Sequence, residues 1–476
     1  MKMLKKILLG IVLFTAAVAV LFVACIGPWP VYKDSKFASS SYYKKALADI
    51  DKNTALADIT GTPGKLRAGW AARSITPPKG TPLNGYGDRK GAPSTGVRDE
   101  LYSKAVVFGD GVDNVALVGN DILIITPNVT DLVRKKVGAQ TPLTANNILF
   151  TASHSHCASG AFAPGVAGRI AGGKYDPKVA EFIANAMADA IIEAYNTMAP
   201  AKMADGAVDT PESIRNRTRD AAVDSALQYM VVEKLTGEKC HVVRFSAHPT
   251  IFGGDQRQFS AEYPGELQRA VESTTGGMCV YLGGAVGSMS PRAPEAPTDS
   301  DRVIAFGQSL ARKVLESAAQ ITEYRTSVDV ASVGMPVGMP GAQMRPVSPK
   351  WRVSPFVTKI MGVPSEGWIQ GVRLGDLFFL GLPYDFSGEL AKEWREEKAR
   401  AGWKLWAHGF SNTYCGYLSP DRYYTELDGK QLGYEIGFMN WFGPNAEAYF
   451  KALFDRMIDK MGPPPVQAMA GTPGAA

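Results

Sequence analysis

The chain has 476 residues, 45% hydrophobic and 20% charged, which is an ordinary composition for a globular protein. Its 51 basic and 46 acidic residues leave a formal charge of only +5, and no Lys/Arg-rich run occurs, so nucleic acid is not an expected partner. The five cysteines form no C-x-x-C pair, which argues against a zinc ribbon or a disulfide scaffold. We expect mostly free, buried thiols.

The N-terminus carries an apolar segment with a basic flank. Lys2, Lys5 and Lys6 precede residues 7–26, which contain no charge. A helix of that length spans about 30 Å, enough to cross a bilayer, and the lysines favour a cytoplasmic N-terminus. An uncleaved anchor is the working interpretation; a cleaved secretory signal and a lipoprotein signal ending at Cys25 stay open. All three place the rest of the chain outside the cytoplasm, periplasmic or extracellular, with the membrane as a partner.

Composition divides the chain into four parts. Residues 1–26 are the anchor or signal, and residues 27–64 are a spacer in which 42–57 are expected to be helical before a Gly-Thr-Pro-Gly break. Residues 65–462 contain no Pro/Gly/Ser-rich linker and are predicted to form one large domain. Residues 463–476 have the composition of a disordered tail.

Within the large domain, strand-like and helix-like patterns alternate. Short apolar runs that predict strands occupy residues 115–118, 122–125 and 148–151. Asp176-Pro177 is a helix start signal. The apolar positions after it have helical spacing: Val179, Phe182, Ile183, Ala186, Met187, Ala190 and Ile191. Further helices are predicted at 301–318 and 387–401, with strands between 325 and 339. The alternation indicates an α/β fold with a mixed sheet flanked by helices.

Two of the five histidines directly follow a predicted strand. His154 and His156 form an H-x-H pair after the run that ends near Thr151. Side-chain direction in an extended chain repeats every two residues, so both imidazoles can point to one side. Neutral imidazole is a good zinc ligand, and catalytic zinc takes about three protein ligands plus water. The alternative is that one histidine is a cap or core residue and the other lies on the surface.

Two further candidates also follow apolar runs. His248 lies in Phe-Ser-Ala-His-Pro-Thr, and Asp385 lies in Gly-Leu-Pro-Tyr-Asp-Phe. Taken alone, His248 fits a hydrogen-bonded structural histidine better than a ligand, and Asp385 fits a helix N-cap. The residues by themselves therefore suggest zinc without assembling a site.

The order of several sequence blocks resembles the neutral/alkaline, non-lysosomal ceramidases, a family of zinc-dependent amidohydrolases. In chain order the blocks are RAGWAARSITPP from residue 67, GY from 85, LYSKA from 101, SHSH from 153, NRT from 216, HPT from 248, YPGE from 263, GSMSP from 287 and SNTYCGY from 411. Each block is weak alone. Their common order over about residues 66–460 indicates kinship.

The resemblance implies a zinc site. In that family, one zinc is bound by the first histidine of the H-x-H pair, the later histidine before proline, a carboxylate and a tyrosine. The corresponding residues here are His154, His248, Asp385 and Tyr417. The cofactor expected from the resemblance is therefore Zn²⁺.

The resemblance also implies the catalytic residues of an amidase. The second histidine of the pair, which contacts the substrate amide, corresponds to His156. An arginine near the reacting carbonyl corresponds to Arg217, and a further tyrosine to Tyr434. The serine of the family's Gly-Asp-Val-Ser-Pro block corresponds to Ser290, which would position the substrate rather than attack it.

The function implied is hydrolysis of the amide bond of ceramide or a related N-acyl sphingolipid, releasing fatty acid and a sphingoid base. Two alternatives stay open: an N-deacylase for glycosylated sphingolipids or another N-acylated lipid, and a metal-free, membrane-anchored lipid-binding relative. No nucleotide is expected, because the glycine-rich stretches at 85–91 and 168–174 lack the spacing or the Ser/Thr of nucleotide-binding loops.

The chain departs from the family pattern in three ways. Asp385 stands where glutamate is usual and is one methylene shorter. Ser288 replaces the aspartate beside Ser290, which puts the inherited role of that serine in question. Because the sequence stops at residue 476, the family's C-terminal β-sandwich domain is expected to be absent.

Overall fold

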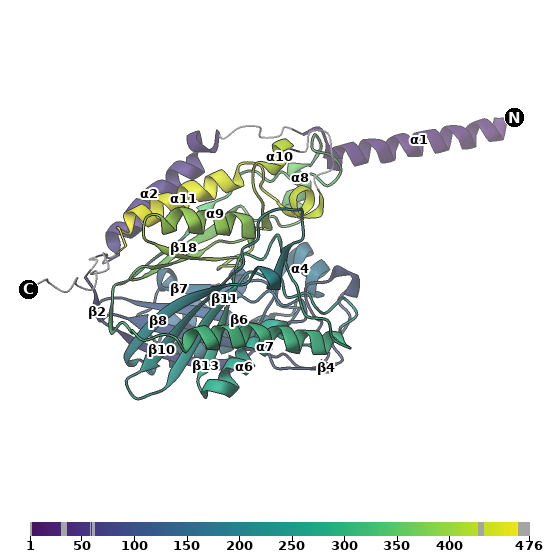
Figure 1. Cartoon of the computed structure of the whole chain (residues 1–476). Coiled ribbons are helices and arrows are strands. Elements are labelled where there is room, and N and C mark those ends of the chain that lie inside the picture. The colour runs from purple at the N-terminus through teal and green to yellow at the C-terminus, as the bar shows by residue number, and fades with distance from the viewer. Residues whose placement is uncertain (1, 30–35, 58, 60–61, 427–432, 465–476) are drawn as a thin grey trace, which may run out of the picture.

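An eight-stranded sheet forms one half of the centre of the computed structural model, which describes residues 2–29, 36–57, 59, 62–426 and 433–464 (Figure 1). The strand order is β13-β11-β10-β8-β3-β5-β6-β7. The strands are β3 (Arg67–Ser74), β5 (Tyr102–Gly109), β6 (Asn114–Asn120), β7 (Ile148–Ala152), β8 (Ala199–Asp209), β10 (Ala226–Lys234), β11 (Lys239–Phe245) and β13 (Met278–Gly283). The pairs β6–β7 and β11–β13 are parallel and the other pairs are antiparallel, so the predicted mixed sheet is confirmed.

A four-stranded sheet packs face to face against the large one. Its order is β16-β18-β19-β21, with β16 (Val330–Gly338), β18 (Glu366–Leu374), β19 (Leu377–Gly381) and β21 (Lys404–His408). Leu117 and Val242 of the large sheet share one buried cluster with Val372 and Trp406 of the small sheet. This cluster is the core between the two sheets.

Helices cover the outer face of each sheet, which gives four layers in the order α/β/β/α (Figure 1). The large sheet is covered by α3 (Pro127–Gly138), α5 (Pro177–Asn196), α6 (Glu262–Thr275) and α7 (Asp299–Ala318). The small sheet is covered by α2 (Ser41–Leu56), α9 (Gly388–Ala399) and α11 (Ala446–Lys460). The predicted α/β class with helices on both sides is therefore confirmed.

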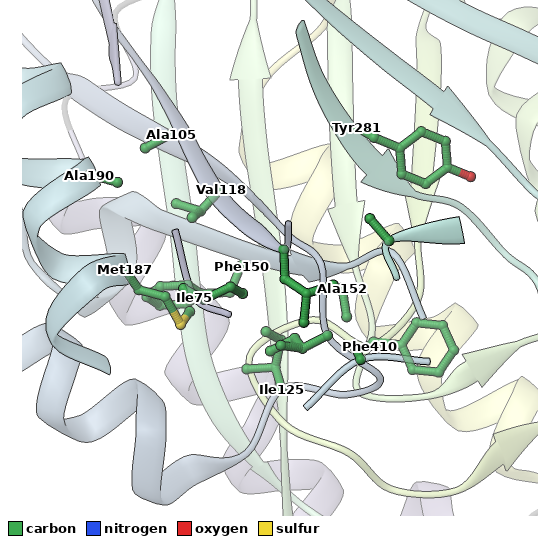
Figure 2. Close-up of a cluster of buried hydrophobic side chains, with 14 of the residues drawn as sticks. Ile75, Ala105, Val118, Ile125, Phe150, Ala152, Met187, Ala190, Tyr281 and Phe410 are labelled. Atoms are coloured by element: carbon green, nitrogen blue, oxygen red, sulfur yellow. The ribbon is translucent and has the colours of Figure 1, made fainter. Parts of the chain in front are cut away.

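Successive side chains along a strand of the large sheet enter two different cores, one between the two sheets and one under the helices. On β6, Val115 and Leu117 face the small sheet, whereas Ala116 and Val118 face the helices. Figure 2 shows Val118 in the helix-side core with Phe150 of β7 and Met187 of α5. Because side chains on a strand alternate between faces, a one-residue slip would exchange the two cores.

Short elements complete the chain. The remaining α-helices of the described residues are α1 (Lys2–Cys25), α4 (Gly165–Gly172), α8 (Pro355–Ile360) and α10 (Tyr423–Glu426). The short strands pair as β1 (Ile26–Gly27) with β17 (Arg352–Val353), β2 (Gly64–Lys65) with β15 (Ser327–Val328), β4 (Gly96–Val97) with β12 (Gln258–Phe259), β9 (Ile214–Asn216) with β14 (Met289–Pro291), and β20 (Asp385–Phe386) with β22 (Tyr417–Leu418). The helix α1 projects from the body (Figure 1) and is long and apolar enough to cross a membrane.

Most predicted elements are found near their predicted bounds. Residues 115–118 lie in β6, 148–151 in β7, 301–318 in α7 and 387–401 overlap α9. The helix expected after Asp176 is α5, and the Asp176 side chain accepts a hydrogen bond from the Lys178 amide as its N-cap. The five cysteines are free and four of them are buried, as predicted.

One segment differs from its sequence pattern, and a second, although helical as predicted, belongs to the core. Residues 122–125 are not a strand: they bend after β6, and the Ile122 carbonyl accepts a hydrogen bond from the His154 amide. The helix expected at 42–57 is α2, which contributes the buried Ala46 and Ile50 to the core over the small sheet. This part of the predicted spacer is therefore packed into the body. Residues 465–476 of the predicted tail lie outside the described residues.

Candidate metal centre

Three strand ends bring the candidate metal ligands together. His154 follows the end of β7 by two residues, and His248 follows the end of β11 by three. Asp385 follows the end of β19 by four. The large sheet therefore supplies the imidazoles and the small sheet supplies the carboxylate, at the edge where carboxyl ends of strands from both sheets meet.

The three imidazoles converge through their Nε2 atoms. The His156 Nε2 atom lies 3.3 Å from His154 Nε2 and 3.0 Å from His248 Nε2. All three residues offer ligand atoms within 4.8 Å of one another. The carboxylate of Asp385 joins the cluster, with its Oδ2 atom 3.7 Å from His154 Nε2.

Backbone carbonyls fix the orientation of two of these rings. The Nδ1 atom of His154 lies 2.6 Å from the Leu123 carbonyl oxygen, and Nδ1 of His248 lies 3.4 Å from the Val286 carbonyl oxygen. Because a carbonyl only accepts, each Nδ1 carries the proton, and each Nε2 presents its lone pair to the cluster. The ring of Phe410, seen in Figure 2, stacks on His154 with centroids 4.0 Å apart.

Electrostatics keeps these imidazoles neutral. Burial lowers the pKa of His154 to about 3, and the nearby Arg217 charge acts in the same direction. Burial likewise holds the pKa of His156 and His248 well below the ordinary value. The Nε2 lone pairs of His154 and His248 both point into the cluster, where a cation can accept them. This part of the structure fits a divalent metal.

The carboxylate fits the same interpretation. Asp385 is fully buried, and within the described residues no donor lies within 3.5 Å of its oxygens in hydrogen-bond geometry, although the Tyr417 hydroxyl is near enough to affect its pKa; so sparse a set of partners is unusual for a buried carboxylate. Burial raises its pKa to about 7 against the opposing charge of Arg217. Two donors bound about 2.0–2.1 Å from one tetrahedral zinc lie about 3.4 Å apart. The 3.7 Å separation of Asp385 from His154 is close to that value despite the shorter side chain.

Tyr417 lies next to Asp385, and Arg217 contacts Tyr417. Strand β22 pairs with β20 so that Tyr417 is the register partner of Asp385. The Arg217 Nη2 atom donates to the Tyr417 hydroxyl at 3.0 Å, and its Nε and Nη2 atoms donate to the Gly287 carbonyl at 3.2 and 3.1 Å. Glu435 lies 3.8 Å from the Arg217 Nε atom. The Gly287 carbonyl and the Tyr417 hydroxyl thereby orient the guanidinium group.

The two remaining candidates lie at the periphery of the centre. Tyr434 opens a short π-helical turn (Tyr434–Met439) and is 59% exposed. Ser290 lies on β14 opposite Arg215 of β9 and is buried. The hydroxyl of Ser288 accepts a hydrogen bond from the Gly388 amide at 3.1 Å. The serine that departs from the family pattern therefore supports the start of α9.

Two residues at the wall of the centre are not among the predicted site residues. Gly85 has φ +101°, and a Cβ there would meet the His156 ring at 2.6 Å. Arg89 donates hydrogen bonds to the carbonyls of His156 at 2.5 Å and Asn84 at 2.8 Å, and so holds His156 in place. Gly85 belongs to one of the family-like blocks, which is a usable signal, whereas nothing in the sequence marks Arg89.

One small hollow adjoins the centre. This hollow of about 10 Å³ is lined by Asp385, Tyr417, Ser288 and Glu435, and is about the size of one water. A cleft of about 1240 Å³ is lined by the loop at 76–82 and by Phe182 of α5, and none of the candidate site residues lines it. The geometry of the imidazoles, rather than cavity size, identifies the candidate site.

Comparison with known proteins finds similarity in sequence to one family and in fold to two solved structures. Residues 67–247 match the family model described as neutral/alkaline non-lysosomal ceramidase, N-terminal. The structure of neutral ceramidase from Pseudomonas aeruginosa is similar with a TM-score of 0.72 at 19% identity, covering 86% of this chain and 76% of that one. A ceramidase complexed with C2 gives a TM-score of 0.71 at 17% identity, covering 86% and 77%. No curated protein sequence matches the chain.

Proposed function

We propose that the chain, whose residues 67–247 match the model of neutral/alkaline non-lysosomal ceramidases, hydrolyses the amide bond of ceramide or a related N-acyl sphingolipid in a zinc-dependent reaction. Water adds to the amide carbonyl, the C–N bond breaks, and a fatty acid and a sphingoid base are released. The observation that carries the proposal is the convergence of three imidazole Nε2 atoms beside a fully buried carboxylate.

The ligands of the proposed zinc are His154, His248, Asp385 and Tyr417. Support comes from the burial of the first three, from the two Nδ1–carbonyl contacts that aim lone pairs inward, and from the register pairing of Tyr417 with Asp385. When bound, zinc polarises the amide carbonyl and lowers the pKa of water near neutrality, which supplies the nucleophile.

The protein's own residues then handle charge and protons. Arg217 is held by the Gly287 carbonyl and the Tyr417 hydroxyl, so that its positive charge faces the centre and stabilises negative charge on the carbonyl oxygen. His156 is the least buried imidazole of the three. It is therefore the one assigned to contact the substrate amide and to pass a proton to the leaving amine.

Two residues are assigned to substrate positioning. Tyr434, with its exposed ring, is placed to contact the substrate or to donate to the developing oxyanion. Ser290 is assigned to binding only, because its neighbour Ser288 is occupied with the start of α9 and does not supply the acid found in the family.

The N-terminal helix supports a membrane location. Residues 2–25 form one helix of about 36 Å, and its window of highest hydropathy is not buried by the body. We assign it as an uncleaved anchor that holds the catalytic domain outside the cytoplasm, close to a lipid substrate.

The test uses the purified full-length protein in detergent with ceramide labelled on the acyl chain. We expect release of labelled fatty acid, loss of release after dialysis against a zinc chelator, and recovery on adding zinc. His248→Ala should abolish both zinc binding and release. His241→Gln, a buried histidine on β11 outside the cluster, is the matched control and should retain both.

Two outcomes would contradict the proposal. Full release of fatty acid by the zinc-free protein would show that the reaction does not need the metal. One zinc per chain without release from ceramide would remove ceramide as the substrate. Running glycosylceramide in parallel separates the deacylase alternative, since that alternative predicts release from the glycosylated lipid alone.

A further inference from the structure

Among the described residues, the C-terminal end of α1 contacts the body at residues 351–354. Strand β1 pairs with β17, and the Ser354 amide donates to the Cys25 carbonyl at 2.8 Å. The ring of Phe22 lies beside that of Trp351, with centroids 6.1 Å apart. A bilayer that contains α1 therefore has its surface close to residues 351–354, and Trp351 lies where tryptophan is enriched at membrane interfaces.

The helix α8 begins immediately after this attachment and exposes an apolar face. Phe356 is 72% exposed and Ile360 is 59% exposed. Lys350 and Lys359 are also exposed. Residues 341–364 contain no Asp or Glu. Exposed apolar residues combined with basic residues and no acidic ones are typical of segments that rest in the headgroup region of a bilayer.

A second surface of the same kind lies on α4, toward the end of the molecule from which α1 projects (Figure 1). Ile170 is 60% exposed and Val166 is 47% exposed. Arg169 and Lys174 are exposed beside them, and residues 159–175 contain no acidic side chain. In composition, α4 repeats the pattern of α8.

The helix α4 adjoins the metal centre. The Gly85 amide donates to the Ala171 carbonyl at 3.1 Å, and Gly85 packs directly on the His156 ring. A lipid surface that contacts α4 is therefore one short loop away from the imidazole assigned to the substrate. Isolated apolar residues on a surface need no explanation, but an apolar face next to the candidate site is a candidate contact surface for a lipid substrate.

We propose that α4 and α8 form a docking surface for the bilayer that holds α1, with anionic lipid as the preferred partner. The surface keeps the side of the metal centre formed by Gly85 and His156 against the membrane, so that a lipid amide can enter without crossing water. The inference rests on the proposed membrane attachment through α1 and is independent of the amidase reaction.

The test measures membrane depth in the full-length chain. Single cysteines at Ile360 and Ile170 carry a fluorescent label in proteoliposomes of phosphatidylcholine and phosphatidylglycerol, in a Cys25→Ser background whose other four thiols are buried. Lipids brominated high on the acyl chain quench a label that lies about 5–10 Å into the interface. We expect quenching at both positions.

Two control positions make the result decisive. A label at Leu13 on α1 must be quenched, because this residue lies within the apolar helix. A label at Leu235, which is 67% exposed at the turn after β10 and so at the opposite end of the sheet from His248, must not be quenched. Absence of quenching at Leu13 would show that α1 does not lie in the bilayer, and would contradict both the anchor and the docking surface.

Quenching at Leu13 without quenching at Ile170 and Ile360 would overturn the docking surface. Energy transfer between labels on two chains, in place of lipid quenching, would assign these faces to a second copy and overturn it equally. Vesicles of phosphatidylcholine alone should give weaker quenching at both positions, because the basic residues then lack anionic partners. Equal quenching in the two lipid mixtures would contradict the preference for anionic lipid.

Discussion

The substitution Gly85→Ala tests whether the position of the His156 ring matters for activity, because it adds one methyl group beside that ring. With φ +101°, Gly85 has a conformation that L side chains rarely adopt, and an added Cβ would lie 2.6 Å from the His156 ring. Ordinary contacts start at 3.4 Å, so the ring must move by about 0.8 Å. A displacement of about 1 Å can cost about a hundredfold in rate when a catalytic group depends on its position. We therefore expect Gly85→Ala to lower kcat for ceramide hydrolysis by about a hundredfold.

Gly80 provides the matched control. It has φ +100°, nearly the same backbone conformation, but a Cβ there would meet nothing within 4 Å. Both alanine variants carry the strain of a positive φ, about 1–3 kcal/mol, so the unfolding free energy should fall in both, and somewhat further in Gly85→Ala because its Cβ also displaces the His156 ring. Only Gly85→Ala should lose activity. Equal loss of activity in the two variants, or full activity in Gly85→Ala, would refute the role given to the His156 wall.

Three further predictions concern stability and charge. Asp224 is buried 2.7 Å from the buried Arg244, so Asp224→Asn should lower the unfolding free energy by about 3–5 kcal/mol in urea denaturation, while Asp51→Asn on the surface should change it little. Although burial alone would raise the pKa of Asp224, Arg244 holds it below its usual range. The loss of unfolding free energy caused by Asp224→Asn should therefore persist at neutral pH and become smaller only in acid. A loss seen only at alkaline pH would contradict this. Burial raises the pKa of Glu262 to about 7, so its contribution to stability is present in acid and lost as the pH rises through 7. Glu262→Gln should accordingly flatten the fall in unfolding free energy between about pH 4.5 and 7, and an unaltered profile would count against it. Arg217→Lys keeps the charge but loses the paired donors to a carbonyl, so kcat should drop by about a hundredfold with zinc content unchanged; loss of zinc would assign Arg217 to the metal instead.

The fold class could be predicted because strands and helices in this chain carry regular patterns. The runs at 115–118 and 148–151 are continuous apolar strands, buried on both faces by two cores. The face-to-face packing of the two sheets could not be predicted, since a strand buried on both faces looks alike whether helices or another sheet cover it. Residues 122–125 were predicted wrongly as a strand for a related reason: they are apolar and buried, but their carbonyls hold His154.

The candidate site was only partly accessible from the sequence. The H-x-H pair could be singled out because His154 and His156 follow a strand at two-residue spacing. Residues as distant as His248 and Asp385 could be joined to them only through the family resemblance, because their convergence depends on how the two sheets meet. Arg89 could not be found at all, since it acts through backbone carbonyls that any residue type provides.

The central claim is that one zinc ion lies between the imidazoles and the carboxylate. Diffraction from crystals of the purified protein at the zinc absorption edge tests it most directly. The account predicts a single anomalous peak about 2.0–2.1 Å from the Nε2 atoms of His154 and His248 and bonded to a carboxylate oxygen of Asp385. An active, zinc-containing protein whose peak lies elsewhere, with these three side chains unliganded, would contradict it.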